Sequence, residues 1–135
     1  MRIDQVQLAT RSLDETARFY ERLGCAVDLD ADAIRVTAGT TRLVFRALDE
    51  MTGAHHLAFT VPTGTFDAAR SRLAGTATIV GTAGPDAADE FEGPPTWNSR
   101  SVYFEGPDRQ LLELIERRDL PADPQPVGAE PFPVR

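Results

Sequence analysis

The feature that most constrains the fold is an order of secondary structure that occurs twice along the chain. Residues 3–10 alternate between apolar and mostly polar side chains, which predicts a half-buried strand. A helix is expected next, because Ser12 and Glu15 form a capping-box pattern and Gly24 is a stop signal. Three shorter strands follow, at residues 26–29, 33–37 and 41–47. The first module therefore has the order strand, helix and three strands.

The second half repeats this order. Residues 55–61 predict a strand, and residues 66–75 predict a helix that ends in glycine. Strands are expected again at residues 77–81, 101–106 and 110–116. Two βαβββ modules in tandem indicate an internal duplication and an α+β fold.

The length of 135 residues fits one domain, which we assign to residues 1–120. Module one covers about 2–47 and module two about 55–118. The halves differ mainly in a loop at residues 82–98, and loops of this length are usually functional or disordered. Residues 121–135 are rich in proline and lack periodicity, so we expect an extended tail without a core of its own.

Composition limits the partners that this chain can have. The net charge is −7, the basic residues are all arginine, and no basic stripe is present, so nucleic-acid binding is not expected. No apolar run is long enough to span a bilayer, and no signal-peptide pattern follows Met1, so no membrane association is expected. The single cysteine, Cys25, cannot form an internal disulfide, which favours a cytoplasmic location.

Strand alternation places three polar side chains on one face. Successive side chains of a strand point to opposite sides of the sheet, and the apolar positions mark the side that faces the helices. By this argument the side away from the helices carries Gln5, His56 and Glu113. Of the two histidines, His56 is therefore the candidate site residue, and His55 is not.

Three segments carry a family resemblance: FYERLG at the end of the first helix, HHLAF in the fifth strand and GPDRQLLELIE near the end. With the duplicated order of elements, they resemble the vicinal oxygen chelate superfamily. That group includes glyoxalase I, extradiol dioxygenases and the bleomycin and fosfomycin resistance proteins. The resemblance covers about residues 2–118 and implies two modules that form a U-shaped mixed sheet around a cup. The turn GPDRQ departs from the family pattern, because Arg109 stands where glycine usually supplies a positive φ. Arginine at this position implies either mild backbone strain or a different turn.

The resemblance also implies a divalent metal in the cup, either Fe, Zn, Ni or Mn. Its ligands would be Gln5, His56 and Glu113, and the position of the fourth ligand is taken by Val44. Valine cannot ligate, so this metal site is incomplete. The alternative is that His56 and Glu113 hydrogen-bond each other or line a cavity without metal.

Further candidate residues follow from the same alternation and from the long loop. Glu113 and Tyr103 are the candidate catalytic residues, as a base and as a hydrogen bonder or acid. Arginine grips carboxylates and phosphates with its planar fork, so Arg42 is a candidate for binding such a group. The full set of expected substrate-binding residues is Gln7, Arg42, Val44, Trp97 and Asn98. Each also has a structural interpretation, in which Tyr103 belongs to the core and Trp97 packs the loop onto the sheet.

Two functions are consistent with these observations. The first is a small-molecule metalloenzyme of the glyoxalase or dioxygenase type, in which the metal binds two neighbouring oxygens of the substrate. The second is a metal-free protein of the bleomycin-resistance type, which sequesters an aromatic or cationic compound in the same cup. The resemblance further implies a homodimer, with the cup formed within one chain or shared by two.

Overall fold

The computed structural model describes residues 3–51 and 53–121. It confirms the duplicated order of elements and adds one short strand, β7, in the long loop of module two. The elements of module one are β1 (Gln5–Thr10), α1 (Leu13–Leu23), β2 (Ala26–Leu29), β3 (Ala33–Ala38) and β4 (Thr41–Ala47). Those of module two are β5 (His56–Val61), α2 (Phe66–Leu73), β6 (Ile79–Val80), β7 (Phe91–Glu92), β8 (Ser99–Glu105), the 3₁₀ turn η1 (Pro107–Arg109) and β9 (Leu111–Arg117).

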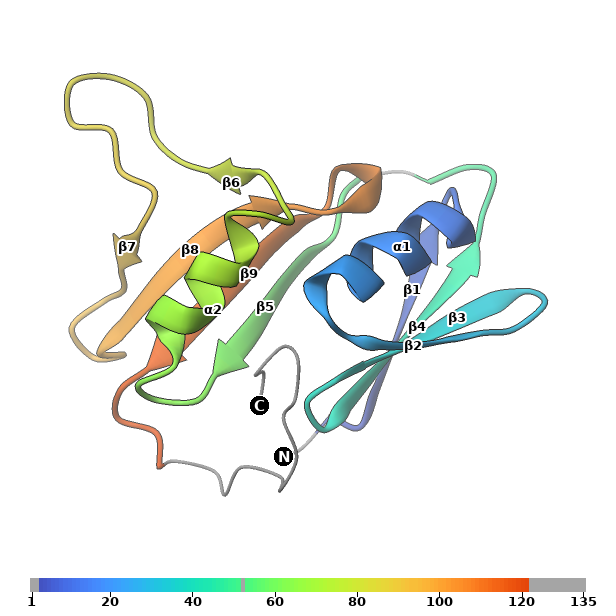
Figure 1. Ribbon diagram of the computed structural model, residues 1–135, viewed down its shortest axis with the longest axis horizontal. Coiled ribbons are helices and arrows are strands. Elements are labelled where there is room, and N and C mark those ends of the chain that lie inside the picture. Colours follow the sequence, from blue (N-terminus) through green and yellow to red (C-terminus); the bar gives the residue numbers. More distant parts are fainter. Residues whose placement is uncertain (1–2, 52, 122–135) are drawn as a thin grey trace.

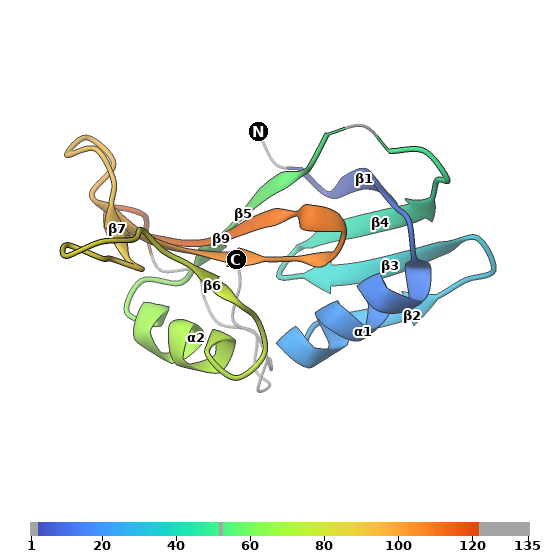
Figure 2. The same ribbon diagram turned by 90° about the horizontal axis from the view of Figure 1, so that it is seen from above.

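Each module forms its own sheet. The strand order is β1-β4-β3-β2 in module one and β5-β9-β8-β6 in module two, where β7 also pairs with β8. In each module the first strand runs parallel to the last, and the other pairs are antiparallel (Figure 1). Both helices lie on the same side of the two sheets (Figure 2). The other side, which we call the open face, carries no helix.

The ends of α1 follow the capping residues that the sequence predicts. The Ser12 hydroxyl accepts a hydrogen bond from the Glu15 amide at 3.2 Å, which satisfies one free donor of the first turn. Gly24 ends the helix at φ 90°, a backbone conformation that costs glycine little. Helix α2 ends at Leu73, two residues before the expected end at Gly75, and its C-cap is Ala74.

One hydrophobic core joins the two modules. It contains residues of α1, β3 and β4 together with residues of α2, β8 and β9. Its largest fully buried side chains are Tyr20 and Phe45 from module one and Phe66 and Phe104 from module two. Because both helices contribute to the same core, the modules are held on one side, and their open faces remain without such a layer.

Two polar contacts also cross between the modules. The Asp108 carboxylate, in η1, accepts hydrogen bonds from the Thr10 hydroxyl at 2.6 Å and from the Arg11 amide at 2.9 Å. The buried Tyr20 hydroxyl donates to Gln110 at 3.2 Å. Burial raises the pKa of Tyr20 far above its usual value, so this phenol stays protonated and keeps its role as a donor.

The far end of module two contains a buried carboxylate that the sequence pattern did not reveal. Glu116 is 2% exposed and accepts hydrogen bonds from the Gly64 amide at 2.6 Å and from Arg100 Nε at 2.9 Å. The Arg100 guanidinium lies 4.3 Å from the centre of the Phe66 ring and also pairs with Asp67. These contacts fix the start of α2 against β8 and β9.

Of the tail at residues 121–135, positions 122–135 lie outside the described residues. None of the helices described here is long and apolar enough to cross a membrane.

The GPDRQ turn carries the backbone strain expected from the missing glycine. Asp108 has φ 55° and Arg109 has φ 61°, in the left-handed region that disfavours residues with a Cβ. We predict that Arg109→Gly increases the free energy of unfolding by about 1 kcal/mol, because glycine adopts this conformation without a steric penalty. Chemical denaturation measures the change. Arg109→Ala is the matched control and should not increase the free energy of unfolding, since alanine retains the Cβ. An equal increase in both variants would contradict the claim that the turn is strained.

Candidate ligand-binding site

The strand registers align the two modules residue by residue. In module one Gln5 pairs with Arg42, and Gln7 pairs with Val44. In module two His56 pairs with Leu111, and Ala58 pairs with Glu113. If Gln5 is equivalent to His56, Val44 is therefore equivalent to Glu113. The register confirms the correspondence expected from the duplication, and it places a valine where module two has a carboxylate.

Glu113 is the central polar residue on the open face of module two. Its side chain is 9% exposed, and both carboxylate oxygens have partners. Oε1 accepts a hydrogen bond from the Ser101 hydroxyl at 2.6 Å, and Oε2 lies 3.1 Å from His56 Nε2. A buried carboxylate needs such partners, because burial without them carries a large desolvation cost. His56 and Glu113 therefore contact each other directly, which is the hydrogen bond that the sequence analysis gave as an alternative to metal ligation.

Tyr103 is the cross-strand neighbour of Glu113. Its pKa is raised, first by burial and then by the negative charge of Glu113 and a hydrogen bond to that carboxylate. A raised pKa keeps the phenol neutral over the physiological range. The Tyr103 ring also meets Phe91 of β7, with 5.5 Å between ring centroids and an angle of 62° between the ring planes. Aromatic pairs commonly adopt this geometry.

A pocket of about 230 Å³ opens beside this group. Three aromatic side chains line it, Phe91 and Trp97 from the long loop and Tyr103 from the sheet. Glu113 and Ser101 also belong to its lining, so that a buried carboxylate and three aromatic rings surround one space. The loop that supplies two of the rings projects from the body of module two (Figure 1).

Ion pairs hold the loop in place. Arg70 of α2 contacts Asp89 at 2.6 Å and Glu90 at 2.7 Å, and Arg118 pairs with Glu92 at 3.1 Å. Next to Glu92 the chain passes so close to β8 that a Cβ at Gly93 would collide with the Ser99 hydroxyl. A larger residue would require the Ser99 side chain to rotate, so glycine lets the loop approach β8 while Ser99 keeps its present rotamer.

The remaining expected site residues are distributed over other parts of the structure. Gln5 and Arg42 line a separate polar cavity of about 270 Å³ on module one, away from His56 and Glu113. Gln7 is exposed, and Val44 is buried. Asn98 lies at the end of the loop, where its amide donates to Asp119 at 2.7 Å.

Trp97 lines the pocket and is half exposed, with the Arg117 guanidinium 4.5 Å from the centre of its ring.

The sequence analysis did not identify two residues of the pocket, Ser101 and Phe91. Ser101 could have been found, because it shares its strand face with Tyr103, but nothing in the local pattern marks Phe91.

Within residues 3–51 and 53–121, the side chains around His56 do not fit a divalent metal. In the described part of the chain, no three histidine, cysteine, aspartate or glutamate residues group together as metal ligands would. His56 and Glu113 supply two ligand atoms, Gln5 lies in another cavity, and Val44 has no ligand atom. Metal sites of proteins usually have at least three protein ligands, so this donor set is short by one or more.

Comparison with solved structures identifies the fold. No protein-family model matches the chain, and no curated protein matches it either. A bleomycin resistance determinant encoded on the transposon Tn5 superposes with a TM-score of 0.66 at 21% identity, covering 89% of this chain and 100% of that one. A bleomycin-binding protein in complex with bleomycin gives a TM-score of 0.64 at 21% identity, covering 86% and 98%.

A third similar structure is a glyoxalase/bleomycin resistance protein/dioxygenase from Alicyclobacillus acidocaldarius, with a TM-score of 0.64 at 19% identity, covering 87% and 92% of the two chains. The chain thus has the α+β fold of these bleomycin resistance and glyoxalase/dioxygenase structures, which is the fold that the resemblance in the sequence implied. At these identities the likeness concerns the fold and leaves the chemistry to the site itself.

The environment of Tyr103 predicts its titration. We expect Glu113→Gln to lower the pKa of Tyr103 toward the ordinary value of 10.0, because the variant removes the negative charge that opposes ionisation. The near-ultraviolet absorbance of tyrosinate follows this titration. The buried Tyr20 should not interfere, since its pKa is raised much further.

Glu105→Gln is the control, because Glu105 is not among the causes of the Tyr103 shift. Equal midpoints for wild type and Glu113→Gln would contradict the contact. The raised pKa of Tyr103 also fixes the direction in which pH changes the stability of the fold. Since the pKa is raised in the folded state, the contribution of Tyr103 is complete below the unfolded value of 10.0 and is lost as the pH rises through the folded value.

Proposed function

We propose that the protein binds small aromatic molecules that carry a basic nitrogen. The observation that carries this proposal is the pocket in which Phe91, Trp97 and Tyr103 surround a buried carboxylate, Glu113. Aromatic walls favour a flat apolar ligand, and they also attract cations through their faces. The carboxylate would pair with the protonated nitrogen of the ligand, so the two features together select this class of molecule.

The wider molecule supports the same class. Its net charge of −7 favours the approach of cations and disfavours anions at long range. One similar structure is a bleomycin-binding protein with bleomycin bound, which shows that this fold can hold a small molecule. No metal is required for the proposed binding, because the polar anchor is Glu113 itself.

We further propose that two copies associate through their open faces. On module one this face carries Arg42 in line with Gln5, while on module two it carries Glu113 and His56. A face of arginine and glutamine opposite a face of acid and aromatic residues is electrostatically complementary. Such a dimer would bring Gln5 of a second copy toward His56 and Glu113, which one chain alone does not do.

A metal-dependent reaction of the glyoxalase or dioxygenase type is the second candidate. The observation that favours it is the 3.1 Å separation of His56 Nε2 and Glu113 Oε2, two ligand atoms of suitable chemistry. This candidate needs at least one further ligand besides His56 and Glu113. It expects untagged protein to contain Fe, Zn, Ni or Mn that disappears in His56→Ala, and elemental analysis tests that expectation.

The binding proposal predicts the effect of removing the carboxylate charge. Phenethylamine should quench the fluorescence of Trp97, the only tryptophan, and Glu113→Gln should weaken its binding about tenfold or more through loss of a charged pair. Phenylethanol has the same ring without the positive charge. It should bind wild type and Glu113→Gln with the same low affinity.

Glu105→Gln is the matched control for net charge, because Glu105 lies on a strand next to that of Glu113 but outside the pocket. It should leave both affinities unchanged. Equal binding of phenethylamine to wild type and to Glu113→Gln would contradict the proposal.

A further inference from the structure

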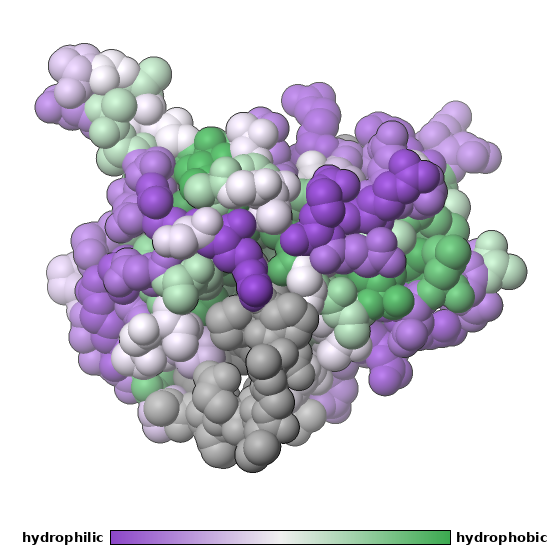
Figure 3. Space-filling view, viewed as in Figure 1, coloured by the Kyte–Doolittle hydropathy of each residue, from purple (hydrophilic) through white to green (hydrophobic). Residues whose placement is uncertain are grey.

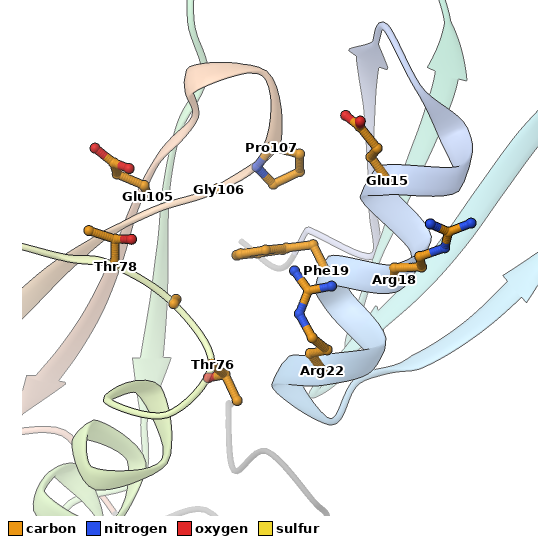
Figure 4. Close-up of a pocket in the computed structure, with 10 residues that line it drawn as sticks. Glu15, Arg18, Phe19, Arg22, Thr76, Thr78, Glu105, Gly106 and Pro107 are labelled. Atoms are coloured by element: carbon orange, nitrogen blue, oxygen red, sulfur yellow. The ribbon is translucent and has the colours of Figure 1, made fainter.

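A polar cleft of about 400 Å³ lies between the two modules. One wall is α1, and the other includes the turn from Glu105 to Pro107 (Figure 4). The lining carries charges of both signs, with Glu15 and Arg22 on α1 and Glu105 on the opposite wall. Hydrophilic side chains border this part of the surface (Figure 3). An apolar group would desolvate these charges at a cost in free energy, so the cleft does not favour an apolar occupant.

A second opening between the modules has a different lining. It is a groove of about 280 Å³, which we call the seam groove. Module one contributes Ile3, Val6 and Leu43 to it, and module two contributes Leu57 and Phe59. Ile3 is 54% exposed, and Val6, Leu57 and Phe59 are only partly buried although they pack against the core. An occupant of the seam groove would therefore remove further apolar surface of both modules from water.

The polar groups of the seam groove suit a peptide. Among the described residues that line it, none is charged and the only polar side chains are those of Thr41 and Thr60, so its other polar groups belong to the backbone. The two strands beside it are edge strands, since among the described strands β1 pairs only with β4 and β5 only with β9. Edge strands present N–H and C=O groups that have no partner in the sheet. Apolar side chains next to such an edge are the lining that extended peptides recognise.

The last described residues lead toward this groove. The Thr63 hydroxyl, just after β5, lies 3.4 Å from the Arg117 carbonyl and 3.5 Å from the Leu120 carbonyl. The chain has therefore passed from β9 to the side of β5, the strand that borders the seam groove. Strand β5 has six residues and spans about 20 Å, whereas residues 122–135 would span about 43 Å as a polyproline II helix. They are long enough to reach every part of the groove.

The sequence of residues 122–135 offers one stretch that matches the groove. Phe132 is their only aromatic residue, and it stands between two prolines and is followed by Val134. Proline has no backbone N–H, so its burial leaves no donor without a partner, while its carbonyl can accept a hydrogen bond from a strand edge. Proline also fixes φ, which reduces the conformational entropy lost when such a segment binds.

We propose that residues 131–134, Pro-Phe-Pro-Val, lie in the seam groove of their own chain, with the Phe132 ring against Val6 and Phe59. A segment in this position contacts both modules and adds to the core that joins them. This role is separate from ligand binding at Glu113 and does not depend on it.

Nuclear magnetic resonance of the full chain with labelled methyl groups tests the contact. We expect nuclear Overhauser effects between the Phe132 ring and the methyl groups of Val6 and Leu57. Phe132→Ala should abolish these effects and shift both sets of methyl resonances, because the aromatic ring no longer lies beside them. Gln125→Ala is the matched control in the same segment. It should leave the methyl resonances of the groove unchanged, since it removes no apolar side chain.

A sample that mixes labelled and unlabelled chains separates the possible occupants. Effects seen only between different chains would place the segment on a second copy and would overturn the proposal. It is also overturned if no such effects are found, or if Phe132→Ala leaves the resonances of Val6 and Leu57 in place. The methyl resonances of Leu114, in the core, should not move in this variant. A shift there as large as in the groove would indicate a change of the whole fold and would likewise contradict the proposal.

Discussion

The arrangement of the molecule depends on the carboxylate of Asp108. It belongs to the turn before the last strand of module two, yet it accepts hydrogen bonds from the Thr10 hydroxyl and the Arg11 amide at the end of β1. The Thr10 hydroxyl also lies 2.7 Å from that of Thr16 in α1. This group joins the turn before β9 to the start of α1, at the cost of a left-handed backbone at Asp108. Together with the shared core, it holds both helices on one side, and the open faces carry no helix.

The duplicated modules have diverged in charge on those open faces. The registers equate Gln5 with His56 and Val44 with Glu113, so that only module two has a carboxylate at this position. Module two also has the longer loop, which brings Phe91 onto the sheet beside Tyr103. The aromatic pocket is therefore a property of one module, although both modules share the βαβββ order apart from the added β7.

Sequence reasoning succeeded where the physical cause is local. Strand alternation placed Glu113 on the opposite side from Leu112 and Leu114, which lie in the core while Glu113 lines the pocket. The ends of α1 follow from Ser12 and Gly24, whose roles depend on neighbours within a few residues. The missing glycine in the GPDRQ turn indicated either strain or a different turn, and the positive φ of Arg109 agrees with strain.

The features that the sequence did not predict depend on contacts between residues far apart in the chain. Alternation places Gln5 and His56 on the same side of their own sheets, but their separation depends on how the sheets are positioned, which no local pattern encodes. The pairing of Arg100 with Glu116 and the packing of Phe91 on Tyr103 have the same origin. Side-chain parity alone could have added Ser101 to the site.

The central claim is that Glu113 acts as a direct anchor for a basic aromatic ligand and that no metal is needed. The most direct measurement is a phenethylamine titration of untagged protein that has been treated with a chelator and shown by elemental analysis to be metal-free. The account predicts that this protein binds as tightly as untreated protein. Binding that is lost with the metal and restored when Fe, Zn, Ni or Mn is added back would contradict it.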